Sequence, residues 1–155
     1  MFVRPAKPHD HAAWIEMRQA LWPECPHAEQ LVEAERTLAS EIQAVFVAES
    51  PTGELCGFIE MALREFASGC ATTPVGYIEG WYVKPQFHRQ GIGRALVAAG
   101  ERWAVERGCV EMASDALLAN AVSQQAHRAL GYEESERLVC FRKGLPARNE
   151  DSSSR

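Results

Sequence analysis

The sequence predicts a single α/β domain in which helices flank a mixed sheet, in the order β-α-α-β-β-β-α-β-α-β. Its 155 residues are enough for one domain with its own core. The hydrophobic share of 46% and the charged share of 24% are ordinary for a globular protein. Stretches rich in β-branched and aromatic residues also alternate with stretches whose apolar residues recur every three or four positions, which predicts interleaved strands and helices.

The first half of the chain is predicted to contain strands at 2–6, 44–49 and 55–66, with a turn at 50–53 between the last two. Two helices are expected between the first and second of these strands. Asp10 is a candidate N-cap of the first helix, and its expected buried residues are Trp14, Met17 and Leu21. A proline-flanked break follows, and the residues expected to share one face of the second helix are Leu31, Glu35, Leu38 and Ile42.

The stretch 77–96 organises the second half of the chain. Residues 77–83 have the composition of a strand, which Lys84-Pro85 ends because proline cannot donate to a sheet. Gly91 and Gly93 then form a turn before a helix, whose expected inward residues are Ile92, Ala95, Leu96, Ala99 and Trp103. Such a turn presents free backbone N–H groups at a helix N-terminus, which favours an anionic ligand.

After this helix, with Gly108 as its candidate C-cap, a strand is predicted at 109–115 and a helix at 120–130. The residues expected to face inward on that last helix are Val122, Ala126, Ala129 and Leu130. A final strand is predicted at 137–142. Residues 146–155 contain no apolar residue larger than alanine, so we expect the domain to span 1–145 and a disordered tail to follow.

Several kinds of anion site compete for the turn. A P-loop needs Gly-Lys-Ser/Thr, which Gly93-Arg94-Ala95 does not supply, and a dinucleotide fingerprint needs a small residue where Leu96 stands. The third kind is a pyrophosphate loop of the acetyl-CoA type. The alternative without a ligand is an ordinary strand-to-helix turn.

At this turn the sequence resembles the GCN5-related N-acetyltransferases, whose signature is Gln/Arg-x-x-Gly-x-Gly/Ala at the end of the fourth strand. The corresponding residues are His88-Arg89-Gln90-Gly91-Ile92-Gly93. His88 departs from the usual first residue, which leaves Arg89, Gln90 and Arg94 as candidates for the anion contact. The resemblance implies acetyl-CoA as the acetyl donor and a mostly antiparallel, twisted sheet.

Forming an amide from a thioester requires a neutral amine, a donor to the oxyanion and a proton for the thiolate. Alternation along the strand is expected to place Tyr77, Glu79, Trp81 and Val83 in one row, where Glu79 is a carboxylate among apolar or aromatic residues. Gly80 beside it suits a β-bulge. Glu79 could take the proton of an ammonium, or it could pair with an arginine on a neighbouring strand. Asp115 ends the next strand and would lie near Glu79 if the two strands are neighbours; alternatively it is a capping or loop residue.

His127 and Asn120 lie on the last predicted helix. Related acetyltransferases often carry a tyrosine four residues before the glycine equivalent to Gly131, and it is proposed to protonate the leaving thiolate. His127 occupies that position and could do the same, or it could be a surface histidine. Asn120 is either a helix N-cap or a ligand of the cofactor arm.

The blocks 77–83, 111–115, 123–134 and 139–143 look like those of the aminoglycoside 6'-N-acetyltransferases. This resemblance implies a homodimer that acetylates the 6'-amine of a polycationic aminosugar. The residues it implies for the antibiotic site are Trp22, Cys25, Phe66, Glu79, Tyr82, Asp115 and Glu136. Those it implies for the cofactor are Trp81, Tyr82, Val83, His88, Arg89, Gln90, Gly91, Ile92, Gly93, Arg94, Ala95 and Asn120.

Several of these positions have simpler interpretations. Trp22 and Phe66 could stack on a sugar ring or belong to the core, and Glu136 could be part of a solvated run of charges. Cys25 stands where histidine is expected in some relatives. An acetyltransferase for another amine, such as a polyamine or a protein N-terminus, and a CoA-binding module without turnover are the alternative functions.

Composition narrows the class of partner. The net charge of −5 argues against nucleic acid and permits a cationic small molecule. No apolar run reaches membrane-spanning length and the N-terminus does not resemble a signal peptide, so a cytoplasmic protein is expected. The five cysteines are an odd number without paired spacing, which predicts neither a disulfide framework nor a metal site.

Overall fold

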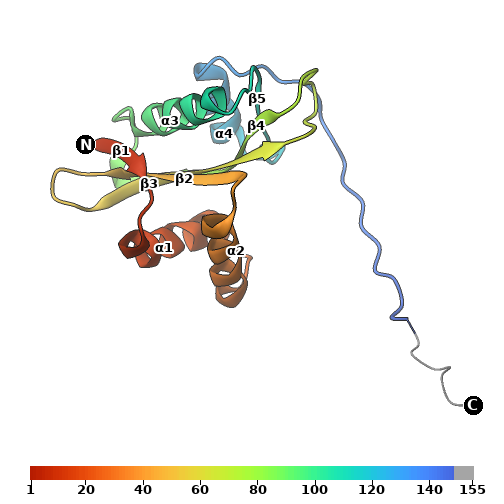
Figure 1. Cartoon of the computed structure of the whole chain (residues 1–155), viewed down its shortest axis with the longest axis horizontal. Coiled ribbons are helices and arrows are strands. Elements are labelled where there is room, and N and C mark those ends of the chain that lie inside the picture. The colour runs from red at the N-terminus through yellow and green to blue at the C-terminus, as the bar shows by residue number, and fades with distance from the viewer. Residues whose placement is uncertain (149–155) are drawn as a thin grey trace, which may run out of the picture.

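A five-stranded sheet with the strand order β1-β2-β3-β4-β5 runs through the centre of the protein (Figure 1). The structure is a computed structural model that describes residues 1–148 of the chain. The strands are β1 (Phe2–Pro5), β2 (Gln43–Glu49), β3 (Leu55–Arg64), β4 (Val75–Val83) and β5 (Met112–Ser114). Neighbouring strands are antiparallel except β4 and β5, which are parallel, so the predicted mixed, mostly antiparallel sheet is confirmed.

Helices cover both faces of this sheet. The helices α1 (His11–Leu21) and α2 (His27–Ala39) lie on one face, and α3 (Ile92–Glu106) and α4 (Ala121–Ala129) lie on the other (Figure 1). Two short 3₁₀ turns, η1 (Pro8–Asp10) and η2 (Pro85–Phe87), precede α1 and follow β4. The core therefore has two layers: Trp14, Met17 and Phe58 are buried beneath α1 and α2, and Met61 and Leu96 beneath α3.

A β-bulge interrupts the pairing of β3 with β4. Glu60 lies opposite Gly80 and Met61 opposite Ile78, so Glu79 has no partner on β3. Consequently the inward and outward alternation of β4 changes phase: Ile78 and Trp81 both pack on the α3 side. The bulge expected beside Gly80 is present, but the expected single row from Tyr77 through Glu79 to Trp81 and Val83 is wrong.

The predicted final strand at 137–142 is wrong as well. Within residues 1–148 no regular element follows α4. Tyr132 still contacts Glu101 and Ser135 still contacts Ser68, and the chain then runs away from the body (Figure 1). We call residues 136–148 the C-terminal arm. Its large apolar side chains are exposed: Leu138, Val139, Phe141 and Leu145. A strand needs a neighbouring ladder, and the arm has none in this chain. The predicted tail at 146–155 lies mostly outside the described residues.

The predicted faces of two helices and the side-chain cap of a third need correction. On α2 the buried residues are Gln30, Ala34 and Thr37, whereas Leu38 is exposed and Ile42 lies beyond the helix end. Arg18 on α1 causes this rotation, since its Nε donates to the Gln30 Oε1 at 2.9 Å. On α4, Val122 and Ala129 are exposed because the short helix covers only the sheet edge. At the start of α1, the Asp10 side chain makes no cap hydrogen bond.

Candidate active site

A pocket of about 320 Å³ opens on the side of the sheet that α1 and α2 cover. Its walls come from both helices and from β2, β3 and β4, and its lining residues are Trp22, Glu33, Arg36, Thr37, Gln43, Glu60 and Glu79. We call it the acidic pocket, because its lining has three carboxylates and one arginine, Arg36. Each carboxylate is paired with an arginine outside the lining, either Arg18 or Arg64, so a cationic ligand competes with these arginines.

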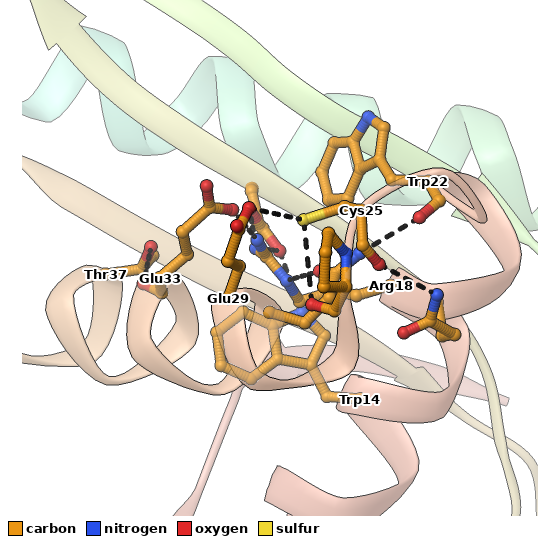
Figure 2. A network of polar contacts seen from close by, with 11 residues as sticks. Trp14, Arg18, Trp22, Cys25, Glu29, Glu33 and Thr37 are labelled. Carbon is orange, nitrogen blue, oxygen red and sulfur yellow. Dashed lines mark hydrogen bonds and ion pairs between the residues drawn. The ribbon is translucent and has the colours of Figure 1, made fainter.

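Arg18 on α1 is bonded to two carboxylates of this lining and is itself only 2% exposed (Figure 2). Its Nη1 lies 2.5 Å from both oxygens of Glu60, and its Nη2 donates to the Glu33 Oε2 at 2.8 Å. Burial raises the pKa of Glu60, while the Arg18 guanidinium and the Trp14 N–H oppose this rise. The Arg18 Cζ also lies 4.8 Å from the centroid of the Trp22 ring, so the same arginine supports the aromatic wall of the pocket.

Glu79 at the bulge joins a chain of contacts that reaches Asp115. Arg64 at the end of β3 donates from Nε to the Glu79 Oε1 at 2.9 Å and from Nη2 to Oε2 at 2.8 Å. The Arg64 Cζ lies 3.5 Å from the centroid of the Tyr77 ring, and the Tyr77 hydroxyl donates to the Asp115 Oδ2 at 2.5 Å. The arginine partner that the sequence left open is therefore present, and both predicted carboxylates belong to one network. Burial and the Asp115 carboxylate raise the pKa of Tyr77.

The strands β4 and β5 separate just beyond this network. They pair only from Gly76 with Met112 to Ile78 with Ser114, so residues 79–83 of β4 have no strand on their β5 side. Free backbone groups along such a fork can bind an extended ligand.

His127 on α4 lies at the fork and is half-buried, which makes it more than a surface histidine. Its Nδ1 lies 2.7 Å from the Ser123 carbonyl oxygen and its Nε2 lies 2.8 Å from the Ser114 Oγ. A carbonyl only accepts, so Nδ1 carries a proton, and Nε2 is left to exchange one with Ser114.

Aromatic rings enclose this histidine. The rings of Trp81 and Tyr132 stand edge-on to it, with centroids 5.4 and 5.8 Å away. The Trp81 Nε1 is buried without a hydrogen-bond partner among the described residues, next to the backbone of Gly93. A buried N–H without a partner is costly, so a ligand atom that accepted from it would be stabilising.

The turn before α3 has the geometry of an anion site. Gly91 precedes the helix with φ of 77°, and Arg89 also adopts a positive φ of 60°. Ala95 is bonded to the Gly91 carbonyl, so the N–H groups of the preceding helical residues point out of the first turn. A negative group placed there would also interact favourably with the helix dipole.

Three other side chains of this turn bond to the chain itself. The His88 Nε2 lies 2.8 Å from the Val83 carbonyl oxygen, and Arg94 donates to the Ala129 carbonyl. Gln90 donates to the Gln86 carbonyl. Among the candidates for the anion contact, Arg89 is thus an exposed cation whose side chain makes no hydrogen bond within the described residues.

The remaining predicted residues lie around the pocket or away from it. Tyr82 packs on Phe58 with ring centroids 6.2 Å apart, and Asn120 caps α4 by accepting from the Ser123 N–H at 3.0 Å. The Cys25 Sγ lies near Glu29 at the start of α2 (Figure 2). Phe66 is exposed just beyond β3, and Glu136 is exposed on the C-terminal arm.

Sequence reasoning missed Arg18, Glu60, Arg64 and Ser114 as parts of the site. Glu60 had a signal, since it is a lone carboxylate in the middle of an apolar strand. The other three had none, because their partners are distant in sequence. Over residues 1–148, no helix is both long and apolar enough to span a membrane, and no cluster of three or more His, Cys, Asp or Glu is arranged around a metal position.

Comparison with known proteins identifies the family. Residues 13–132 match the sequence profile of the acetyltransferase (GNAT) family. The aminoglycoside N(6')-acetyltransferase type 1 of Stenotrophomonas maltophilia is 44% identical over 144 residues, which is 92% of this chain and 93% of that protein.

Solved structures agree in fold. AAC(6')-Iy in complex with the bisubstrate analogue CoA-S-monomethyl-acetylneamine superposes with a TM-score of 0.87 at 36% identity, covering 92% of this chain and 97% of that one. The 6'-N-acetyltransferase AAC(6')-IG from Acinetobacter haemolyticus gives 0.89 at 35% identity, covering 94% and 100%. The chain therefore belongs to the acetyltransferase (GNAT) family and, within it, to the aminoglycoside N(6')-acetyltransferases.

Proposed function

We propose that this protein transfers the acetyl group of acetyl-CoA to the 6'-amino group of aminoglycosides. The observation that carries the proposal is the position of Glu79. It lies on the wall of an acidic pocket and at the bulge where β4 leaves β5, so an amine held on this carboxylate would meet a thioester lying in the fork. Two relatives support this acetyl transfer, one an aminoglycoside N(6')-acetyltransferase and the other an enzyme bound to an analogue that joins CoA to acetylneamine.

The residues of the fork and the turn fit acetyl-CoA. Its pyrophosphate would lie on the N–H groups of residues 91–94, with Arg89 as the nearby free cation. Its pantetheine arm would run along residues 81–83, where the unpartnered Trp81 Nε1 could donate to it. Asn120 already caps α4 through its oxygen, which leaves its amide nitrogen for the cofactor. When bound, acetyl-CoA supplies an activated acetyl group.

The proposed reaction is a direct transfer. Glu79, with Asp115 nearby, orients the ammonium and takes its proton directly or through water. The neutral nitrogen forms a bond to the acetyl carbon while the backbone N–H of Val83 donates to the oxygen that becomes negative. The carbon–sulfur bond then breaks, and the thiolate takes a proton from His127, whose Nε2 faces Ser114. The nitrogen gives up its second proton to water as the amide forms.

The experiment that tests this function is thiol release from acetyl-CoA across an aminoglycoside panel. We expect turnover with members that carry a 6'-amine and none with members that carry a 6'-hydroxyl. Turnover only with polyamines or peptide N-termini would favour the acetyltransferase of another amine. Binding of acetyl-CoA by calorimetry without thiol release from any amine would favour a non-catalytic CoA-binding module.

Replacing Glu79 by glutamine tests the role of its carboxylate. We expect kcat/KM with kanamycin or tobramycin to fall by about 10²-fold, because the amine loses both its anchor and its proton acceptor. Glu54→Gln is the matched control, since Glu54 is also an exposed carboxylate paired with one cation, Lys84. An unchanged pH profile of kcat/KM in Glu79→Gln would reject Glu79 as base or anchor.

We also propose that the protein is a cytoplasmic homodimer. The support for the dimer is the C-terminal arm, whose strand-like segment 137–142 carries exposed apolar residues while β5 ends the sheet with an open edge. A second copy of the chain would cover both. The support for the location is a set of free cysteines, which suits a reducing compartment.

A further inference from the structure

Arg64 occupies the carboxylate that the proposed reaction needs for its amine. Its guanidinium forms a two-point fork with Glu79, with one nitrogen on each oxygen at 2.9 and 2.8 Å. A fork of this kind is the strongest side-chain geometry for an arginine and a carboxylate. In this arrangement the cation that is paired with Glu79 is a side chain of the protein itself.

The surroundings of Arg64 keep it charged and fix its position. It lies over the Tyr77 ring, whose hydroxyl bonds to Asp115, so it sits between the two carboxylates of the site. The hydrogen bond to Glu79 is the main cause that raises the pKa of Arg64, and the charge of Asp115 raises it further. The arginine is therefore a permanent cation in the place where an ammonium would be drawn.

We propose that Arg64 is an internal competitor of the substrate, a cation that a substrate ammonium must displace from Glu79. This inference rests on the function proposed above. A monoamine exchanges one ion pair for another and gains little. A polycation brings a further ammonium group to Glu33, whose side chain is 54% exposed on the same pocket wall, so it can displace the guanidinium with a net gain.

The exposure of the pair makes the exchange feasible. The Arg64 side chain is 41% exposed and that of Glu79 is 29% exposed, so water screens the pair and compensates the guanidinium once it swings away. An ion pair of this kind is weak enough to be broken by a ligand. It is still strong enough to change an affinity by about three- to tenfold.

The test is Arg64→Gln in the full chain, with calorimetry of kanamycin binding beside steady-state kinetics. We expect Kd and KM for kanamycin to fall about three- to tenfold, with kcat changing less than about twofold. The reason is that displacement precedes chemistry and costs the bound state and the transition state equally. Methyl 6-amino-6-deoxyglucoside, a monoamine, should gain about as much as kanamycin, because the displaced cation is the same.

Three further variants keep the inference falsifiable. Arg64→Lys keeps the cation and should keep KM near that of the parent chain. Arg107→Gln is the matched control, an exposed arginine stacked on Trp103 at 4.5 Å and away from the site, and should change neither constant. In a Glu79→Gln background, Arg64→Gln should no longer lower Kd, because the competition acts through Glu79.

Two results would overturn the inference. One is a fall of kcat in Arg64→Gln without a lower KM, which would mean that the arginine only orients Glu79. The other is a Kd for kanamycin in Arg64→Gln equal to that of the parent chain. Failure of the proposed function looks different, since the parent chain would then acetylate no aminoglycoside while the calorimetric comparison of Kd still reports on Arg64.

Discussion

Asp10 illustrates at the scale of one residue how a buried carboxylate can be stabilising. It is 4% exposed and accepts from both Nη atoms of Arg4 on β1 and from the Lys7 backbone N–H. The hydrogen bond to Arg4 is the main cause that lowers the pKa of Asp10, in opposition to burial. The carboxylate thus ties the first strand to the start of α1, although it does not act as the expected N-cap.

The lowered pKa predicts the pH dependence of Asp10→Asn. The contribution of Asp10 to the free energy of unfolding is fully present above its ordinary pKa and is lost as pH falls through the folded value. At pH 7 we expect Asp10→Asn to lose about 2 kcal/mol, and the difference from the parent chain to shrink in acid. Urea unfolding from pH 7 to pH 3 measures this, with Glu16→Gln as an exposed control on α1. A difference that is constant over this pH range would contradict it.

Among elements, β4 shows best what could and could not be predicted from the sequence. Its composition predicted a strand at 77–83, and Gly80 predicted the bulge. What the sequence pattern could not supply is the phase change at Glu79, because that depends on pairing with β3. The pairing decides that Glu79 faces the acidic pocket while Trp81 faces the fork.

Long-range polar contacts explain most of the other differences. Gln30 lies on the buried face of α2, where it bonds to Arg18 on α1. The spacing of apolar residues along α2 cannot predict that bond. Arg64 gains its importance from Glu79, fifteen residues away. Glu79 could be selected from the sequence because a carboxylate is unusual among apolar residues of a strand. Asp115 could be selected because it ends a strand, and His127 through the resemblance to related acetyltransferases. Their roles in the reaction stay predictions.

The absence of a side chain at Gly80 is a testable requirement of the pocket wall. A Cβ at Gly80 would clash with the Trp22 ring, whose other face is packed against Arg18. We expect Gly80→Ala to cost about 1–3 kcal/mol of unfolding free energy and to raise KM for aminoglycosides, because Trp22 must move. Gly144→Ala is the control, since nothing lies within 4 Å of its Cβ position. Equal unfolding midpoints for the two variants would contradict the expected clash.

At the scale of the whole molecule, the C-terminal arm is the largest feature without a partner in its own chain. Its predicted strand had the right residues, but a strand forms only against a neighbour. This is why the fold of residues 1–130 could be predicted from local patterns while the arm could not. Phe141, 93% exposed, is the clearest reason for the proposal that a second copy of the chain covers the arm.

Truncating the arm tests the proposed homodimer. We expect the full chain to sediment as a dimer and a chain ending at residue 132 to sediment as a monomer, because the exposed apolar segment is lost. A chain that ends at residue 148 is the control and should remain dimeric. A second variant, Val139→Glu with Phe141→Glu, should dissociate the dimer without shortening the chain. Monomeric full-length protein at assay concentrations would contradict the proposal.

The short ladder between β4 and β5 has a consequence for how the protein opens. Only three residue pairs hold β5 to the sheet, whereas β3 and β4 are paired along nearly their whole length. The local unfolding of the segment from β5 through α4 therefore costs less free energy than that of the central strands β3 and β4, and the segment can detach while these strands stay folded. Since Ser114 and His127 both belong to this segment, such excursions would take the histidine away from Trp81 and leave Glu79 in place.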